Sequence, residues 1–453
     1  MTQDRALELM TSGANIFLSG PPGSGKSFVL EQFVGVSRRF GRRLALTATT
    51  GIAASLLGGV TIHSWSGLGV KQQLAPTDID LLLANPHLVR RLTETEILII
   101  DEISMLDAVT FESIDRLLKV ARSSSASFGE IQLILSGDFF QLPPVSNNDD
   151  SYCFLSNVWA DADLKACYLS EQHRQSSDEL LEVLSALREQ RFTKNHLEML
   201  SARQGVPHPP LTMLLTHNKD VDVLNNKRLA ELGGQVRSYL RQCKGDKGLS
   251  NDLERSVLAP KELFLKVGAE VMFVANDPQK QYVNGTQGSV VAFRFGLPVI
   301  ELKESKVAIV AQAFSWKRET DNRAAELIQL PIKLAWAITI HKCQGMSLDA
   351  ADIDLKRSFV SGMGYVALSR LKKYRGLYLQ SYNSRSLELD KTVYAFDREL
   401  RKNSDINEVK ETNSELDRIV QSLHQAGMNE WLIKQSTGLT KHQLKSVFKR
   451  LNI

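Results

Sequence analysis

The stretch Gly20-Pro21-Pro22-Gly23-Ser24-Gly25-Lys26-Ser27 decides the fold of this 453-residue chain. It follows the pattern G-x-x-x-x-G-K-[ST], in which backbone N–H groups turn inward onto phosphate oxygens. An apolar run, Ile16 to Leu18, precedes it, and residues 29–34 carry apolar side chains at helical spacing. The N-terminus of a helix adds positive potential to these donors. We therefore expect ATP or a close relative to bind here.

The loop residues have separate expected roles. Lys26 would reach the β- and γ-phosphates, and Ser27 would bind Mg²⁺. The alternative is a glycine-rich turn that matches by chance, but the flanking strand and helix favour the nucleotide site. The loop residues expected to contact the cofactor are Gly20, Gly23, Ser24, Gly25, Lys26 and Ser27.

Composition narrows the class of protein. The length predicts about three domains, and 43% hydrophobic with 23% charged residues is typical of a soluble globular protein. No apolar run approaches the roughly 20 residues that cross a bilayer. The loop begins at residue 20, so we expect no cleaved leader. The four cysteines form no C-x-x-C pair, which argues against zinc and disulfides and favours a reducing cytoplasm.

The net charge of +4 is concentrated at one end of the chain. Residues 421–453 contain five Lys or Arg and one Glu, which accounts for the whole excess. The rest of the chain is neutral. This balance argues against a broad basic binding face and leaves a narrow groove with a few cations.

Two carboxylates follow a second apolar run. Residues 97–100 read as a buried parallel strand, and Asp101 and Glu102 come directly after it. Ligands bind at the carboxyl ends of such strands. Asp101 would hold Mg²⁺, directly or through water, and Glu102 would polarise the attacking water. The alternative is a merely solvated strand end.

A third apolar run, residues 131–135, leads into the segment Gly137–Val145. Its polar amide, Gln141, follows a strand end where a γ-phosphate could be sensed, and it would orient water. The alternative is that Gly-Asp and Pro-Pro serve only as loop punctuation.

Together these segments resemble the Pif-type DNA helicases of superfamily one, of bacterial or phage type. Gly20–Ser27, Asp101–Met105 and Gly137–Val145 are similar to motifs I, II and III of that family. Gln3 occupies the position of its adenine-reading glutamine. The similarity extends over about residues 1–395 with every motif in order. The further matching segments are Thr47–Ala54 (motif Ia), Gly59–Ser64 (Ib), Ser170–Gln175 (IV), Lys266–Gly288, Ile340–Leu348 (V) and Tyr365–Arg370 (VI).

The resemblance implies an α/β fold with two RecA-like P-loop domains and ATP in the cleft between them. Residues 1–175 would form the first, with a small strand-separating insertion at about 66–95. Residues 176–395 would form the second, with a small β-barrel insertion at about 288–330. That barrel matches short β-rich runs at 290–293, 298–302 and 307–310. Residues 66–95 predict only one short helix between loops.

Two arginines lie far along the chain from the phosphate loop. The resemblance places Arg174 in motif IV and Arg370 in motif VI. An Arg at the γ-phosphate stabilises charge that develops during transfer. If both come from the other domain, hydrolysis requires a closed cleft. The alternative for each is a surface ion pair.

The resemblance also assigns DNA contacts. A groove that holds a backbone without reading sequence suits hydroxyls, backbone N–H groups and a few cations. Trp65, Phe139 and Phe140 could offer stacking faces, although a core role is more typical of each. The expected contacts are Thr49, Thr50, His63, Ser64, His341 and Lys342.

The tail, residues 396–453, lies beyond the resemblance. Residues 401–415 are polar and read as a linker. Residues 431–435, a Thr-Gly turn and a basic segment with Leu444, Val447, Phe448 and Leu451 at helical spacing resemble a helix-turn-helix. The tail would contact DNA or a partner, or it is an amphipathic helix docked on the body.

The resemblance implies an ATP- and Mg²⁺-dependent helicase, active as a monomer. It would move 5′ to 3′ on single-stranded DNA and unwind duplexes, RNA–DNA hybrids or G-quadruplexes. Its partners would be single strands and single-strand/duplex junctions in the cytoplasm or on the nucleoid, in repair, recombination or telomere-like maintenance. Two alternatives remain: an ATP-gated clamp on single strands without unwinding, and a P-loop ATPase unrelated to nucleic acid.

Overall fold

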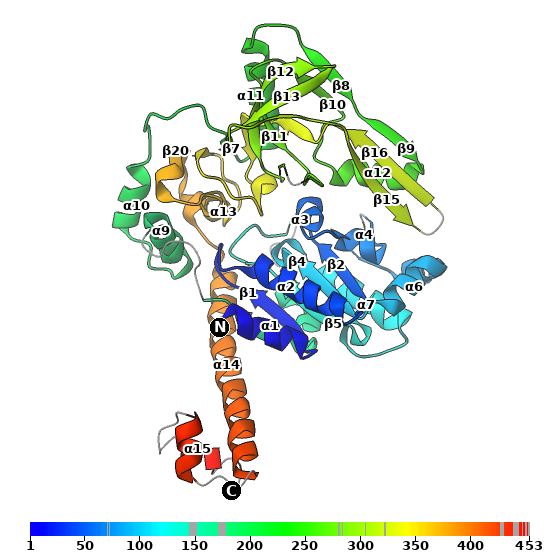
Figure 1. Cartoon of the computed structure of the whole chain (residues 1–453), viewed down its shortest axis with the longest axis vertical. Coiled ribbons are helices and arrows are strands. Elements are labelled where there is room, and N and C mark those ends of the chain that lie inside the picture. The colour runs from blue at the N-terminus through cyan, green and yellow to red at the C-terminus, as the bar shows by residue number, and fades with distance from the viewer. Residues whose placement is uncertain are drawn as a thin grey trace.

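The computed structural model describes residues 1–69, 71, 73–144, 152–170, 178–279, 281–282, 284–303, 305–320, 323–425, 430–437, 444–445, 447–448 and 451. The chain has two α/β units, each built on a parallel sheet, which we call the N-terminal layer and the second layer. A β-rich region covers both, and one long helix extends away from them (Figure 1). Within the described residues, no helix is long and apolar enough to cross a membrane.

The N-terminal layer is built on a six-stranded parallel sheet of order β3-β2-β4-β5-β1-β6. The apolar runs at 16–18, 97–100 and 131–135 form β1, β4 and β5, as predicted. They are buried because helices cover both faces of a parallel sheet. The strands are β1 Ile16–Ser19, β2 Leu44–Ala48, β3 Val60–Thr61, β4 Ile97–Asp101, β5 Gln132–Ser136 and β6 Lys165–Tyr168.

Helices surround this sheet. The prediction of one short helix in residues 66–95 was wrong, because two helices, α5 and α6, occur there. Pro76 and Pro86 each stand in the first turn, where the missing N–H costs nothing, so they start helices rather than interrupt them. The helices are α1 Gln3–Thr11, α2 Lys26–Arg39, α3 Gly51–Leu56, α4 Ile62–Ser66, α5 Pro76–Leu83, α6 Pro86–Glu94, α7 Ala108–Ala121 and α8 Asn157–Asp161.

A second parallel sheet has the order β18-β7-β19-β20. Two parallel sheets of this kind agree with the predicted pair of RecA-like domains. Their buried residues form one continuous core, which extends from Phe17 and Leu98 to Ile353 and Leu379. The elements are α9 Glu179–Arg188, α10 Lys194–Ser201, β7 Met213–Leu215, α11 Asn218–Glu231, β18 Ala337–Thr339, β19 Ala351–Leu355, α13 Met363–Ser369 and β20 Leu377–Tyr382.

The β-rich region contains the three predicted runs as parts of β12, β13 and β14. Five antiparallel strands pair in the order β14-β13-β12-β11-β17, and three more in the order β15-β16-β9. The earlier strands β8 and β9 escaped prediction because their side chains are mostly exposed and lack apolar alternation. The elements are β8 Arg237–Leu240, β9 Gln242–Gly245, α12 Lys247–Ser256, β10 Glu262–Leu265, β11 Glu270–Phe273, β12 Gln287–Arg294, β13 Leu297–Leu302, β14 Ala308–Val310, β15 Phe314–Thr320, β16 Arg323–Gln329 and β17 Ile332–Leu334.

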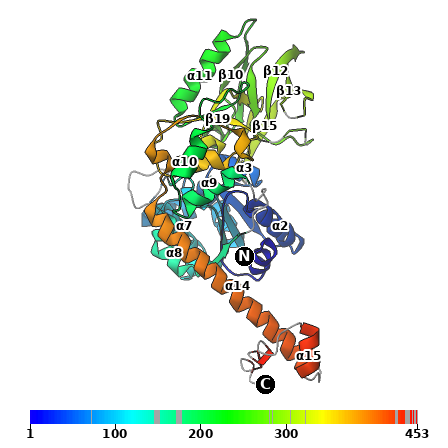
Figure 2. The same cartoon turned by 90° about the vertical axis from the view of Figure 1, so that its left-hand side faces the viewer.

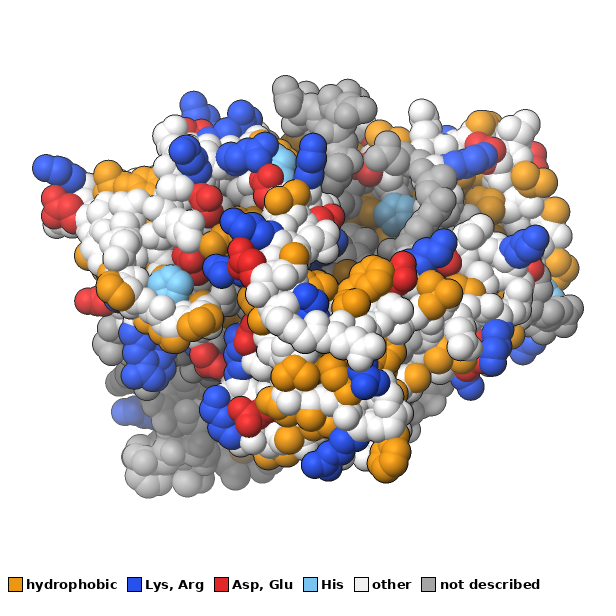
Figure 3. Space-filling model, turned by 90° about the horizontal axis from the view of Figure 1, so that it is seen from above, with side chains coloured by type: hydrophobic (Ala, Val, Ile, Leu, Met, Phe, Trp, Pro, Cys, Tyr) orange, Lys and Arg blue, Asp and Glu red, His pale blue; other side chains and the backbone are white. Residues whose placement is uncertain are grey.

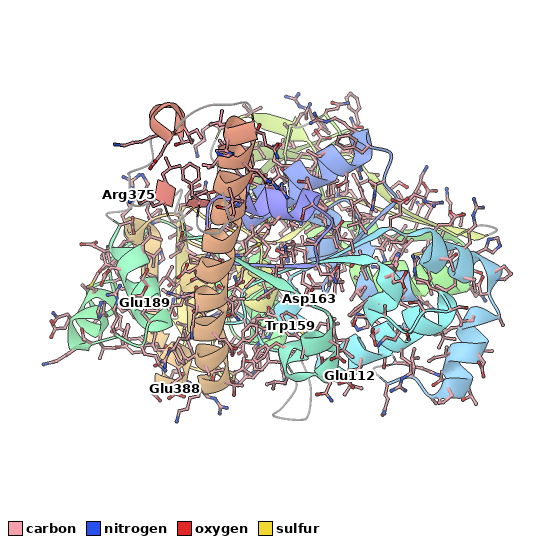
Figure 4. The ribbon with its side chains drawn as sticks, turned by 90° about the horizontal axis from the view of Figure 1, so that it is seen from below. Glu112, Trp159, Asp163, Glu189, Arg375 and Glu388 are labelled. Carbon is pink, nitrogen blue, oxygen red and sulfur yellow. The ribbon has the colours of Figure 1, made fainter. Side chains whose placement is uncertain are left out.

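The predicted linker at 401–415 was wrong, because helix α14 runs unbroken over Lys391–Gln425. The segment contains no Gly or Pro, and a helix that is polar all round is stable when it bridges through solvent. Its first turns pack on the N-terminal layer, where Ser404 Oγ accepts a hydrogen bond from Tyr168 N at 2.9 Å. Trp159 of α8 and Glu189, which follows the end of α9, lie on opposite sides of α14 (Figure 4).

The far end of α14 carries a small helical cluster (Figure 2). Helix α15, Glu430–Thr437, folds back beside it. Val420, Ile433, Leu444 and Val447 are buried together there. The spacing predicted for the last segment therefore marks an apolar face that packs within this cluster. The predicted Thr-Gly turn lies outside the described residues.

Candidate nucleotide site and nucleic-acid groove

The phosphate loop connects the end of β1 to the start of α2. Gly23 and Gly25 have φ of +84° and +90°, a conformation that L side chains rarely adopt. A Cβ at Gly25 would lie 1.9 Å from Nε2 of Gln3, and one at Gly20 would lie 2.7 Å from the Leu169 carbonyl oxygen. Only glycine fits at these two close approaches. The loop therefore has the glycine-dependent backbone that the motif requires.

The loop contains a buried cation and a buried hydroxyl that a phosphate would suit. The Lys26 ammonium donates to the carbonyl oxygens of Gly20 at 2.7 Å and Pro21 at 3.2 Å, and burial lowers its pKa. Ser24 Oγ is buried and has no hydrogen-bond partner among the described residues. A phosphate group would accept from both and compensate the buried cation. The loop therefore fits a nucleoside triphosphate.

Two carboxylates stand at the carboxyl end of β4. β4 pairs with β5, which pairs with β1, so Asp101 and Glu102 lie near the loop. Burial raises the pKa of Asp101. Burial, and next the neighbouring Asp101, raise the pKa of Glu102 to about 7, against the effect of Arg370 and Lys26. A carboxyl group whose pKa lies near 7 suits a general base.

The residues predicted to hold Mg²⁺ are Ser27 and Asp101. The described residues contain no group of three or more His, Cys, Asp or Glu arranged for a metal. Mg²⁺ commonly takes one or two protein ligands and completes its shell with phosphate oxygens and water. A hydroxyl and a carboxylate beside the phosphate loop therefore fit a cation that arrives with the nucleotide.

Groups from the second layer reach this site. Arg370 Nη2 donates to Gln141 Oε1 at 3.4 Å, and both residues are buried. Gln344 Nε2 donates to Glu102 Oε2 at 3.0 Å. Sequence reasoning predicted Arg370 and Gln141 but missed Gln344, although it lies inside the quoted motif V. Arg174 lies outside the described residues.

Gln3 lies directly against the loop. Its Nε2 donates to the Ser24 carbonyl oxygen at 3.1 Å. The N-terminal ammonium donates to the Tyr168 carbonyl oxygen at 3.0 Å and so fixes the start of α1. This brings the predicted adenine-reading residue to the rim of the nucleotide site.

The predicted DNA contacts fall into two groups with different roles. Thr49 Oγ1 donates to the Glu102 carbonyl oxygen at 2.8 Å, and Thr50 Oγ1 accepts from Ala53 N at the start of α3. These two hydroxyls already have protein partners. The half-buried Ser64 stands on α4, where its backbone N–H donates to Thr61 Oγ1.

His63, His341 and Lys342 remain as polar contacts. Burial lowers the pKa of both histidines, so at pH 7 they are neutral and would hydrogen-bond rather than pair ionically with phosphate. Lys342 is exposed on the turn His341–Cys343, and the His341 ring stacks on Phe359 with centroids 6.0 Å apart. The turn thus presents an exposed cation of the kind that holds a phosphate backbone.

A groove of about 400 Å³ separates the N-terminal layer from the β-rich region. Gly51 and Thr61 line one wall, and Phe314, Trp316 and Lys317 of β15 line the other. The two aromatic rings lie 4.8 Å apart at 58°. Sequence reasoning missed this wall. Its signal was the alternation of aromatic, polar and basic residues at 314–317.

The aromatic residues singled out from sequence belong to the core. Trp65, Phe139 and Phe140 are 4%, 4% and 2% exposed, so none can offer a face to a base. Phe139 contacts Phe154 and Phe396 instead. Their typical core role is confirmed.

A buried arginine that sequence reasoning missed joins both layers. Arg188, at the end of α9, donates at 2.8 Å to Asp138 and at 2.8 Å to Asp397 of α14. It also donates to the hydroxyls of Tyr168 at 3.1 Å and Tyr365 at 3.0 Å. Its signal was a charge within the apolar stripe of α9. We call Arg188 and these four partners the Arg188 hub.

Comparison with known proteins decides the family. A model of PIF1-like helicases matches residues 4–202, and a model of the 2B domain of DNA helicase Pif1 matches residues 248–293. The "ATP-dependent DNA helicase Pif1" of Psychrobacter sp. is 37% identical over 458 residues, which cover 86% of this chain and 69% of that protein. The chain belongs to the Pif1-like helicase family.

Other Pif1 helicases are also similar to this chain over most of its length. That of Bdellovibrio bacteriovorus is 35% identical over 398 residues, which cover 87% of this chain and 90% of that protein. Bacteroides sp. Pif1 in complex with ADP-AlF4 is 29% identical, covers 88% of this chain and 96% of that one, and matches with a TM-score of 0.76. Bacteroides Pif1 in complex with ADP-AlF3 and single-stranded DNA is 30% identical with the same coverages and a TM-score of 0.65.

Proposed function

We propose that this chain is an ATP-dependent DNA helicase that moves 5′ to 3′ on single-stranded DNA. The observation that carries the proposal is the meeting of Lys26, Asp101 and Glu102 from one layer with Arg370 and Gln344 from the other. Relatives named ATP-dependent DNA helicases support it. The polarity rests on the family resemblance.

The nucleotide chemistry follows from the residues at the loop. Mg²⁺-bound ATP supplies the γ-phosphoryl group that is transferred to water. The loop N–H groups and Lys26 would hold the phosphates, and Ser27 and Asp101 would hold the cation. Glu102 accepts a proton from the attacking water, and Gln141 orients that water beside it.

Arg370 would complete the site from the second layer. Arg370 is 5% exposed. Its Nη2 donates across the layers to Gln141 Oε1 at 3.4 Å, which is long for a hydrogen bond. An arginine beside the transferred phosphoryl group stabilises charge that exists only in the transition state. Hydrolysis therefore depends on how closely the two layers approach.

The single strand would lie in the groove beside β15 and along the turn that carries His341 and Lys342. Hydroxyls, neutral imidazoles and one or two cations grip a backbone without reading sequence. The Phe314–Trp316 wall offers ring faces for bases. Charges of both signs are interspersed on the face drawn in Figure 3, which suits a narrow groove better than a broad basic surface.

Several finer features belong to the same proposal. The enzyme would act as a monomer in the cytoplasm, on single-strand/duplex junctions, RNA–DNA hybrids or G-quadruplexes. The residue ranges predicted for the two domains, their insertions and the tail also stay proposals. The cluster at the end of α14 exposes Lys434 and Lys445 and would give a second, weak contact to DNA.

The test is the rate of ATP hydrolysis with and without a single-stranded oligonucleotide, with Lys26→Ala as the control for contaminating activity. We expect strong stimulation of the wild-type rate and no hydrolysis by the variant. An ATPase that ignores single-stranded DNA would refute the proposal.

A further inference from the structure

Glu102 is contacted by two of the three segments expected to bind DNA. From motif Ia, Thr49 Oγ1 donates to its backbone carbonyl oxygen at 2.8 Å. From motif V, Gln344 Nε2 donates to its carboxylate at 3.0 Å. The two contacts come from different sheets and hold one residue at both its backbone and its side chain.

The backbone of Glu102 makes it sensitive to these contacts. Its φ of 53° and ψ of 41° lie in the left-handed region, which is uncommon and costly for a residue with a side chain. Such a conformation persists only where the surroundings enforce it. The Thr49 hydroxyl therefore helps to fix where the carboxylate points.

Gln344 is placed to transmit a movement. It is only 7% exposed and lies two residues after Lys342, on the C-cap of the same short turn. Its N–H donates to the His341 carbonyl oxygen at 3.4 Å. A shift of the turn as a DNA backbone settles on His341 and Lys342 would carry the amide of Gln344 with it.

The Gln344 side chain uses its Nε2 donor but not its Oε1 acceptor. Gln344 Oε1 is buried and has no partner among the described residues. Gln344 carries no charge, whereas the charged groups that face Glu102 are Asp101, Lys26 and Arg370. Its contact therefore orients the carboxylate without altering the charge of the site, and its free oxygen leaves an acceptor beside the base.

We propose that Gln344 is a positioning residue that links the DNA-contacting turn His341–Cys343 to the base Glu102, so that DNA binding sets the rate of hydrolysis. Thr49 gives a second, weaker link from motif Ia. This inference rests on the proposed function and adds the route by which DNA reaches the chemistry.

The experiment measures kcat for ATP with and without single-stranded oligo(dT), and the Kd values for ATP and for oligo(dT). Gln344→Met keeps the size of the side chain and removes the donor. We expect its DNA-stimulated kcat to fall about tenfold or more, the effect of losing a hydrogen bond to a charged group. Its DNA-free kcat should fall by a clearly smaller factor, so that the stimulation by DNA is lost, and both Kd values should stay within about twofold.

Three further variants sharpen the result. Gln344→Glu removes the donor and brings a like charge, so its loss should equal or exceed that of Gln344→Met. Thr49→Val should lose stimulation by a smaller factor, and the double variant with Gln344→Met should show non-additive losses because both act on Glu102. Gln32→Ala, on the exposed face of α2, is the matched control and should behave as wild type.

Two outcomes overturn the inference, and they differ from failure of the proposed function. Wild-type stimulation in folded Gln344→Met would remove the link. A loss of oligo(dT) affinity that matches the loss of rate would show that Gln344 acts only by binding DNA. If wild-type hydrolysis itself ignores DNA, the proposed function fails and the inference fails with it.

Discussion

Two contacts join the same pair of layers in opposite ways. In the Arg188 hub, a guanidinium that is 4% exposed has four partners, two of them carboxylates at 2.8 Å. At the nucleotide cleft, Arg370 donates across the layers to Gln141 at 3.4 Å, a longer contact than any in the hub. Buried oxygens of Ser24 and Gln344 there have no partner among the described residues.

The hub is therefore a fixed connection between the layers, whereas the cleft is a contact that a ligand can change. A buried charge that is fully paired is expensive to expose, so the hub should stay closed through every state of the enzyme. At the cleft, buried oxygens of Ser24 and Gln344 lack partners among the described residues and the Arg370–Gln141 hydrogen bond is long, so a bound nucleotide can change how closely the layers approach. We infer that the layers pivot at the hub while the cleft opens and closes.

The largest expected effect comes from removing the arginine that reaches across the nucleotide cleft. Arg370→Ala should lower kcat for ATP about 10³-fold or more, because an arginine at the transferred phosphoryl group contributes on that scale. ATP affinity and thermal stability should change little. Steady-state hydrolysis, ATP titration and a melting curve measure these. An equal loss of ATP binding and hydrolysis would argue against a role confined to the transition state.

The next effect breaks the hub. Arg188→Met should lower the free energy of unfolding by about 3–5 kcal/mol, because Asp138 and Asp397 would remain buried without their partner. Chemical denaturation measures it. Arg191→Ala is the matched control, since Arg191 lies on the surface with Glu182 and Glu189 and should cost less than about 1 kcal/mol. Equal, small effects would show that the hub is no joint.

A smaller effect weakens the cleft without breaking it. Gln141→Ala should lower kcat about five- to tenfold, the cost of one hydrogen bond to water or to Arg370. Combined with Arg370→Ala it should add almost nothing. Additive losses in the double variant would contradict a shared role.

The smallest effect lies outside both contacts. Removing residues 416–453 should reduce the slope of log Kd for DNA against log salt by about 1 to 3, since each phosphate contact contributes close to one. Lys434→Gln with Lys445→Gln should reproduce part of this change, whereas Lys402→Gln on α14 should not. An unchanged slope would leave the tail as a docked helical cluster.

The cleft was predictable from sequence and the hub was not. The phosphate loop, Asp101, Glu102, Gln141 and Arg370 are local patterns at strand or helix ends. Local patterns reveal such positions because the backbone there is constrained by the few residue types that fit. Their grouping followed from a resemblance over the ordered motifs.

The hub depends on contacts that no local pattern encodes. Arg188 is separated from Asp138 by 50 residues and from Asp397 by 209. The same holds for Gln344 and Glu102, which are 242 residues apart. The polar composition of the tail was misleading, because α14 is held by its first turns against β6 and by Val420 in the cluster at its far end. Side-chain partners of this kind appear only when the chain is folded.

Unwinding of matched duplexes with a 5′ or a 3′ single-stranded tail tests the central claim most directly, with wild type and Arg370→Ala side by side. We predict ATP-dependent displacement from the 5′-tailed duplex alone, and none by the variant although it still binds ATP and DNA. Displacement from the 3′ tail alone would contradict the polarity. DNA-stimulated hydrolysis without displacement from either tail would show an ATP-gated clamp instead of a motor.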